Sequence, residues 1–150
     1  MDETCLVWSL SEKTKLYKVE HRSITGDPKS ILNHVRLLPD LTLGFDLITS
    51  GSDGTVRFWR GGQPVKSLYH SSSCRRFDLD KTNRILAVAT ADKPHFTGPS
   101  EGGVTVWQLE NFEKVGEEEI GNTMDVRFNA DSTKIIAVKD SGEVYKISLE

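Results

Sequence analysis

His21, Ser50 and Asp53 are the three residue types of a catalytic triad, and Ser52 lies beside the same acid. A serine hydroxyl becomes a nucleophile when a histidine takes its proton and a carboxylate orients that histidine. The same side chains can instead serve the fold, because the indole N–H of Trp59 needs an acceptor when buried and these groups can pass that hydrogen bond onward. We favour the structural interpretation and predict that the chain has no catalytic residue.

Other residues that could bind a metal or act as a nucleophile lack the spacing that such sites need. Cys5 and Cys74 are too few for a disulfide framework or a zinc site, and we expect Cys74 to be a small buried strand residue. The sequence has no glycine-rich loop of the kind that binds phosphate. The histidines are too scattered to share one ligand set: His21, His34, His70 and His95. We predict no metal and no cofactor.

Four segments of the sequence resemble one another. Each begins with an acid, usually turns on a small residue, and continues as an alternating strand. They recur at intervals of roughly 40–50 residues, which is typical of architectures that repeat and stack one small sheet. The segments are Asp2–Trp8, Asp53–Trp59, Glu101–Trp107 and Asp140–Lys146. This repeat favours a binding surface over an active site.

Each repeat contains up to four short runs with strand character, which we call a, b, c and d in chain order. The acid-led segments are the c strands. The other predicted strands are a at Leu32–Leu37, Cys74–Leu79 and Thr123–Phe128, b at Leu47–Ser50, Arg84–Thr90 and Lys134–Val138, and d at Lys15–Glu20, Pro64–Tyr69 and Lys114–Ile120. No window has sustained helical periodicity, so the sequence predicts an all-β fold of four-stranded antiparallel units.

The stretch LITSGSDGTVRFW at Leu47–Trp59 resembles the WD-repeat family, whose unit is one blade of a β-propeller. The resemblance implies a buried hydrogen-bond set made of a histidine before strand a, a hydroxyl in strand b, an acid at the b–c turn and the tryptophan of strand c. The matching positions are His21, Ser50, Asp53 and Trp59, then His70, Thr90 and Trp107 with Asp92 or Glu101, and lastly Asp140 alone. The sequence departs from the family in lacking a glycine before the histidines and an aspartate after each tryptophan. Because Lys146 replaces the last tryptophan, we expect that blade to be held less rigidly.

The predicted strands make a segment of a propeller, an incomplete ring. Residues 1–20 supply strands c and d of a first blade, residues 31–69 and 73–120 supply complete blades, and residues 122–148 supply a, b and c of a last one. An open arc leaves unpaired sheet edges, which proteins avoid. We therefore expect either a piece of a longer polypeptide, which we favour, or one part of a split propeller that a second chain completes.

Two insertions are candidate recognition loops: Arg22–Ser30 between strands d and a, and Ala91–Gly103 between b and c. Connections of these two kinds emerge on one face of a propeller, and long loops on a rigid scaffold often carry binding. The candidate partner-binding residues are Arg22, Lys29, Arg75, Arg76, Lys93, His95 and Phe96. The alternatives are that the loops are tolerated insertions and that the adjacent arginines pair with Asp78, with Asp80 or with acids of a neighbouring blade.

The composition limits the class of partner. The net charge is −3 and no apolar run is long enough to cross a bilayer, so we expect neither nucleic-acid binding nor membrane insertion. The acidic start of the chain and its two cysteines favour an intracellular protein, cytoplasmic or nuclear. The acidic run at 117–119 is either a solvated edge or a docking patch for a basic partner.

We expect a non-catalytic protein–protein interaction scaffold within a larger complex, with other proteins or peptides as partners. The main alternative is a substrate-receptor module that binds phosphopeptides or degrons, because arginines bind such groups through paired hydrogen bonds. It would use Arg75, Arg76 and Lys93. A module whose edges complete another chain's ring also stays open, whereas an enzyme would need a nucleophile or a metal that the sequence does not provide.

Overall fold

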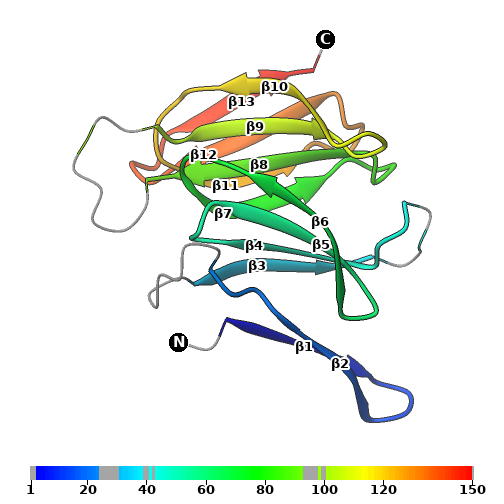
Figure 1. The fold of residues 1–150 in the computed structure, drawn as a ribbon. Helices are drawn as coiled ribbons and strands as arrows, with labels where there is room; N and C mark the ends of the chain where they lie inside the picture. Colours follow the sequence, from blue (N-terminus) through cyan, green and yellow to red (C-terminus); the bar gives the residue numbers. More distant parts are fainter. Residues whose placement is uncertain are drawn as a thin grey trace.

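The computed structural model describes residues 3–23, 31–38, 41, 43–92, 98 and 101–149. Within these residues the fold is all-β, with 13 strands and no helix. The strands run antiparallel in four separate sheets, which lie one beside the next along the chain (Figure 1). None of these described sheets closes on itself.

The sheets follow chain order, and each strand pairs with its neighbours in sequence. Sheet A contains β1 (Thr4–Ser9) and β2 (Thr14–Glu20). Sheet B contains β3 (Leu32–Leu37), β4 (Leu47–Gly51), β5 (Thr55–Arg60) and β6 (Gln63–Tyr69). Sheet C contains β7 (Ser73–Leu79), β8 (Ile85–Ala91), β9 (Gly103–Gln108) and β10 (Glu113–Glu118). Sheet D contains β11 (Thr123–Phe128), β12 (Lys134–Lys139) and β13 (Val144–Ser148).

The prediction of an all-β fold with strands grouped as two, four, four and three is confirmed. Alternating apolar residues bounded by turn residues define these strands well, because one face of each strand must be buried. Asp53 and Glu101 lie before the strands of their repeated segments, since β5 begins at Thr55 and β9 at Gly103. Both acids therefore belong to the connections between strands.

The core consists of three apolar layers between consecutive sheets. Val7 and Val19 of sheet A contact Leu47 and Trp59 of sheet B. The other face of sheet B packs on sheet C through Phe45, Ile48, Val56, Phe58, Leu68, Phe77, Leu79, Leu86 and Val88. The opposite face of sheet C packs on sheet D through Ala87, Ala89, Val104, Val106, Val126, Ile135 and Ala137. Each large side chain buried here contributes about 1.5–3 kcal/mol, so the sheets are held by their faces.

The outer faces of the first and last sheets remain open to solvent. In sheet A, Trp8 is 55% exposed and Leu16 is 54% exposed, and in sheet D Val144 is 67% exposed. The tryptophan at the end of β5 is only 4% exposed, because sheet A covers it. The equivalent tryptophan of β1 has no such cover among the described residues.

The registers of sheets B and C align their positions one by one. Trp59 pairs with Leu47 in sheet B, and Trp107 pairs with Leu86 in sheet C. Counting back from the two tryptophans, Arg57 corresponds to Thr105, Thr55 to Gly103 and Asp53 to Glu101. On the neighbouring strands, Thr49 corresponds to Val88 and Gly51 to Thr90. These pairs lie at one end of the sheets, next to the connections that carry His21 and His70.

Candidate functional site

In sheet B, a buried chain of hydrogen bonds connects Trp59 to Asp53 through His21. The Trp59 indole N–H donates to Thr49 Oγ1 over 2.8 Å, and that hydroxyl lies 2.7 Å from His21 Nδ1. His21 Nε2 lies 2.9 Å from Thr55 Oγ1 and 3.3 Å from Asp53 Oδ1. His21 is fully buried, so every one of these contacts replaces water.

The pattern assigns the proton of His21. A carboxylate can only accept, so Nε2, the nitrogen facing Asp53, must carry a hydrogen, and in the neutral ring Nδ1 accepts from the Thr49 hydroxyl. Thr55 donates to Asp53 Oδ1 over 2.8 Å from its hydroxyl and over 3.0 Å from its backbone N–H. Burial alone would oppose ionisation, but the hydrogen bonds from His21 and Thr55 outweigh it and hold the pKa of Asp53 well below its usual range.

Arg57 closes this network on the solvent side. Its Nη2 donates to Asp53 Oδ2 over 2.8 Å and to the Arg22 carbonyl over 2.5 Å, while its Nε donates to Thr55 Oγ1 over 3.1 Å. The side chain of Arg57 is 12% exposed and that of Asp53 is 1% exposed. The guanidinium thus fills the end of the sheet and seals the histidine from water.

The expected hydroxyl, Ser50, is not part of the network. Its Oγ is buried without a hydrogen-bond partner among the described residues, and Thr49 takes its place. Successive residues of a strand point to opposite faces, so Thr49 shares the face of Trp59 and Arg57 while Ser50 faces the other way. Ser52, the second candidate, receives the backbone N–H of Ile31 at its Oγ and braces the connection instead.

Replacing Thr49 by valine should lower the free energy of unfolding by about 1–3 kcal/mol, because the Trp59 N–H and His21 Nδ1 both lose their partner. Replacing Ser50 by alanine should change it by less than about 0.5 kcal/mol or raise it, because a buried hydroxyl without a partner is removed. Urea unfolding of both variants checks this pair. A larger loss for Ser50→Ala than for Thr49→Val would restore the assignment that the sequence suggested.

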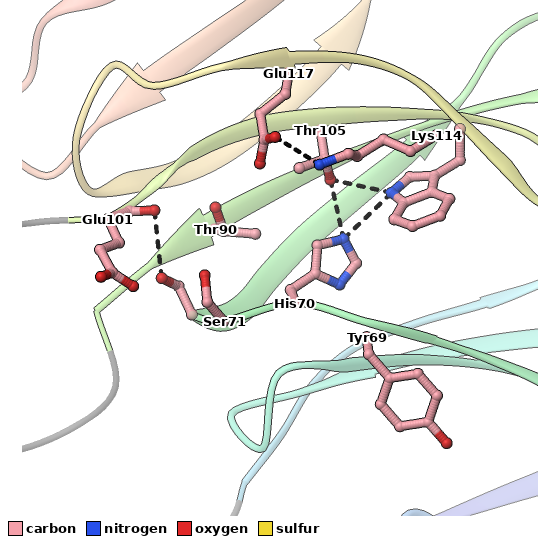
Figure 2. Close-up of a pocket in the computed structure, with 10 residues that line it drawn as sticks. Tyr69, His70, Ser71, Thr90, Glu101, Thr105, Lys114 and Glu117 are labelled. Carbon is pink, nitrogen blue, oxygen red and sulfur yellow. Dashed lines mark hydrogen bonds and ion pairs between the residues drawn. The ribbon is translucent and has the colours of Figure 1, made fainter.

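Sheet C holds its tryptophan with a different arrangement (Figure 2). The Trp107 N–H is shared between His70 Nε2 and Thr105 Oγ1, at 3.2 Å from each, and the Thr105 hydroxyl lies 3.0 Å from the same nitrogen. Because an indole N–H can only donate, Nε2 of His70 must accept and the proton must sit on Nδ1. Nδ1 lies 3.2 Å from Cys74 Sγ, and Cys74 is fully buried, as expected for a small strand residue. The two histidines therefore carry opposite tautomers.

The remaining expected members of this second set, Thr90, Asp92 and Glu101, form other hydrogen bonds. The Thr90 hydroxyl exchanges hydrogen bonds with the backbone of Gly103, accepting from its N–H over 3.0 Å. Asp92 Oδ1 accepts the backbone N–H of Glu101, and the Glu101 carbonyl accepts from Ser72. Neither acid has a hydrogen bond or ion pair with His70 in the described part of the chain, so the second set consists of His70, Thr105 and Trp107.

Sequence differences between equivalent positions explain the change. Val88 replaces Thr49, so strand β8 has no hydroxyl at the position that relays the tryptophan hydrogen bond in sheet B. A Cβ atom at Gly51 would lie 2.6 Å from His21 Nε2, so the missing side chain lets that ring approach. Thr90 occupies the corresponding position in sheet C. His70 therefore cannot take the same place and lies against Trp107, with ring centroids 5.5 Å apart.

A polar cavity of about 160 Å³ opens beside His70, where sheet B is sealed. Figure 2 shows side chains from the sheet B to sheet C connection and from β8, β9 and β10 converging on it. The position of Arg57 is taken by the much shorter Thr105, and this leaves the space unfilled. The lining residues are Tyr69, His70, Ser71, Ser72, Thr90, Glu101, Thr105, Trp107, Lys114 and Glu117.

His70 is neutral at pH 7. Burial is the main cause that lowers its pKa to about 4, and Lys114 lowers it further, against opposing effects of the Gly54 backbone and Glu117. Lys114 and Glu117 pair with each other over 2.6 Å at the mouth of the cavity. The cavity therefore offers hydroxyls, one neutral imidazole and more negative than positive charge.

Sheet D lacks a comparable site among its described residues. Asp140 is exposed, and its backbone N–H donates to the carbonyl of Asn122. Lys146, which replaces the tryptophan, is exposed as well. That this sheet is held less rigidly than the others stays a prediction.

The expected partner-binding residues fall into two groups. Arg22 is exposed and pairs with Glu20 over 2.6 Å, Arg76 is exposed, and Arg75 donates to the Asp92 carbonyl over 3.4 Å while its Nε is buried without a partner among the described residues. The others lie outside the described residues: Lys29, Lys93, His95 and Phe96.

The acids proposed to neutralise the arginine pair are engaged elsewhere. Asp78 pairs with Arg36 over 2.7 Å and accepts the backbone N–H of Phe128. Asp80 orders the turn after β7 by accepting from the backbone of Thr82, Arg84 and Ile85. Among the described residues, neither acid has a hydrogen bond or ion pair with Arg76.

The described ranges hold neither a cluster of metal ligands nor a helix that could span a membrane. They contain no group of three or more His, Cys, Asp or Glu side chains that could hold a metal ion. They also contain no helix with the length and apolarity that crossing a membrane requires.

Comparisons with known proteins identify a fold and no family. No family model matches the chain, and no curated protein matches it. The chain is similar to the crystal structure of the computationally designed Ika4 protein, with a TM-score of 0.73 and 18% sequence identity over 99% of this chain and 81% of that one. At this identity the similarity shows the fold alone.

Proposed function

We propose that the chain is a segment of a WD-repeat-type β-propeller that acts as a non-catalytic protein–protein interaction scaffold. Sheets A to D would be its blades, at residues 1–20, 31–69, 73–120 and 122–148. The stacking of consecutive up-and-down sheets through their faces supports this arrangement. So does the hydrogen-bonded link between a histidine and a tryptophan at the same end of both sheets, which runs through Thr49 in sheet B and is direct in sheet C.

The residues that could perform chemistry are engaged in holding the sheets. Both nitrogens of His21 contact hydroxyls or a carboxylate, and the Nε2 of His70 accepts from Trp107 and Thr105. A general base must have a free lone pair within reach of a substrate proton. These occupied nitrogens support a structural role for the histidines.

The single observation that carries a binding role is the contrast between sheets B and C. Their frameworks match position by position, yet one end is sealed by Arg57 and the other opens into a polar cavity. A rigid scaffold that differs between repeats at its rim is typical of proteins that present surfaces to partners.

The open edges and faces at both ends support a larger assembly. Sheet A has two strands, the outer strand β13 of sheet D pairs on one side among the described residues, and apolar side chains such as Trp8 and Val144 stay exposed. Exposed apolar faces favour association. The remaining blades would come from the same polypeptide or from a second chain, within an intracellular complex.

A second candidate is a module that reads phosphopeptides or degrons. Arg76 favours it, because this side chain is exposed while Asp78 is paired with Arg36. Guanidinium groups bind phosphate through two parallel hydrogen bonds. Arg75 contributes less, since it already reaches the Asp92 carbonyl.

Quantitative affinity purification with the chain as bait tests the proposed function. Arg76→Glu changes an exposed side chain of strand β7, and Thr105→Arg fills the cavity. We expect one or both variants to reduce recovery of specific partners about tenfold. Arg60→Glu, at an exposed position beyond Trp59, is the matched control and should leave recovery unchanged. A partner set that all three variants recover equally would contradict binding at this end of sheet C. Loss of binding after phosphatase treatment would favour the second candidate.

A further inference from the structure

The cavity beside His70 has the geometry of an arginine site whose arginine is missing. We propose that it binds the guanidinium group of an arginine side chain supplied by a partner protein. This inference rests on the proposed function in that the ligand belongs to a protein. It goes further by naming the residue type that the partner must present.

Sheet B provides the internal precedent. At its equivalent position, Arg57 reaches along the end of the sheet and donates to a carboxylate, a threonine hydroxyl and a backbone carbonyl. Three acceptors of different kinds within reach of one guanidinium suit it because its donors form a rigid planar fork. The same fold thus already holds one arginine in this environment.

Sheet C keeps a carboxylate and several hydroxyls at this end of the sheet and loses the arginine, with Gly103 in place of Thr55. Glu101 stands at the position of Asp53, and the Thr105 hydroxyl faces the cavity with those of Ser72 and Thr90. Glu117 lies directly across from Thr105 in the register of β9 and β10, where sheet B has Ser67 opposite Arg57. The lining therefore carries one carboxylate more than its counterpart.

Volume and charge fit the same ligand. The cavity of about 160 Å³ is many times the about 10–15 Å³ that a single water needs, so a larger group can enter. Glu101 and Glu117 carry two negative charges against the one positive charge of Lys114, and His70 adds none. Trp107 supplies an aromatic surface, which attracts a guanidinium more than a strongly hydrated ammonium.

Lys114 would compete with an incoming guanidinium for Glu117, and its replacement therefore tests the site. It pairs with Glu117 over 2.6 Å, but its side chain is 45% exposed, and exposed ion pairs of this kind contribute little. An incoming guanidinium can therefore displace it from Glu117. Removing the lysine charge should strengthen binding, whereas removing the glutamate charge should weaken it.

The test is an NMR titration of the ¹⁵N-labelled chain with N-acetyl-arginine methylamide. The three tryptophans give three indole N–H signals, and Trp107→Phe assigns the one at the cavity. We expect a saturable shift of the Trp107 signal and no shift of the Trp59 signal, because Arg57 seals that site. The matched lysine and citrulline compounds should bind about tenfold more weakly, since one lacks the planar fork and the other the charge. Free arginine that binds more tightly than the blocked compound would point to a free amino acid and overturn the proposal of a partner side chain.

Variants separate the site from the fold. Thr105→Arg should fill the cavity from within, as Arg57 does, and abolish the shift while the rest of the spectrum stays dispersed. Glu117→Gln should weaken binding about tenfold and Lys114→Gln should strengthen it, whereas Glu113→Gln on the same exposed strand should change nothing. Equal binding of all three compounds, or a Thr105→Arg chain that binds as well as the original, would overturn the proposal. If arginine binds here and no protein partner depends on the cavity, the proposed function fails and the guanidinium site stands.

Discussion

Replacing Asp53 by alanine is expected to lower the free energy of unfolding by about 3–5 kcal/mol, because one partner of a buried charged network is removed. Asp53 receives hydrogen bonds from Thr55, Arg57 and the ring of His21, and its side chain is 1% exposed. Without the carboxylate, the His21 Nε2–H and the Arg57 guanidinium keep their burial and lose their strongest acceptor. The network that locks sheet A to sheet B then loses its anchor.

Denaturant unfolding at pH 7 measures this effect, with Asp140→Ala as the matched control. Asp140 opens the equivalent segment of sheet D but is exposed, so its replacement should change stability by less than about 0.5 kcal/mol. The Asp53 contribution is fully present above the pKa of an unfolded aspartate, about 4, and is lost as the pH falls further, because the folded pKa is lower. Equal effects of the two substitutions would contradict a buried network at Asp53.

Lowering the pH from 7 to 4 should cost the fold about 2–3 kcal/mol through His70. Its pKa is about 4 in the folded chain and near 6.5 when unfolded, since burial opposes the charged ring. Between these values the unfolded chain takes up a proton that the folded chain does not, so stability falls as the pH falls. Below pH 4 both states are protonated at this residue and its effect levels off.

Unfolding curves at pH 7, 5.5 and 4 test this dependence. His70→Gln keeps an acceptor for the Trp107 N–H but cannot titrate, so most of the slope between pH 6.5 and 4 should disappear. A smaller slope remains from His34, whose pKa is also lowered, mainly by burial and then by Arg76 and Arg127. An unchanged slope in His70→Gln would show that His70 takes up its proton equally in both states.

Much of the architecture could be predicted because local patterns define it. Alternating apolar residues and acid-led turns locate each strand, and a four-stranded up-and-down unit follows from their order. The hydrogen-bond network of sheet B could be predicted only in part. Its hydroxyl was placed one residue off, at Ser50 rather than Thr49, because the face of a residue depends on its register with Trp59 across the turn. Counting every second residue from Trp59, and from Leu47 across the turn, identifies Thr49 as the hydroxyl on the same face.

The cavity could not be predicted, because it results from differences among positions far apart in sequence. Arg57 and Thr105, like Gly51 and Thr90, lie about 40–50 residues apart in the sequence, and only the registers of the two sheets show that they occupy equivalent positions. Thr90 was expected beside His70 and instead binds Gly103, which has no room for a side chain because a Cβ atom there would meet the Glu118 carbonyl. The long insertions remain predictions, since most of their candidate residues lie outside the described ranges.

The opposite tautomers of His21 and His70 test the account most directly, because they follow from the hydrogen bonds that distinguish the sealed sheet from the open one. Long-range ¹H–¹⁵N NMR of the imidazole rings at pH 7 reports which nitrogen carries the proton. We predict a proton on Nε2 of His21, next to Asp53, and on Nδ1 of His70, whose Nε2 accepts from Trp107. The same tautomer for both rings, or a His70 that is charged at pH 7, would contradict it.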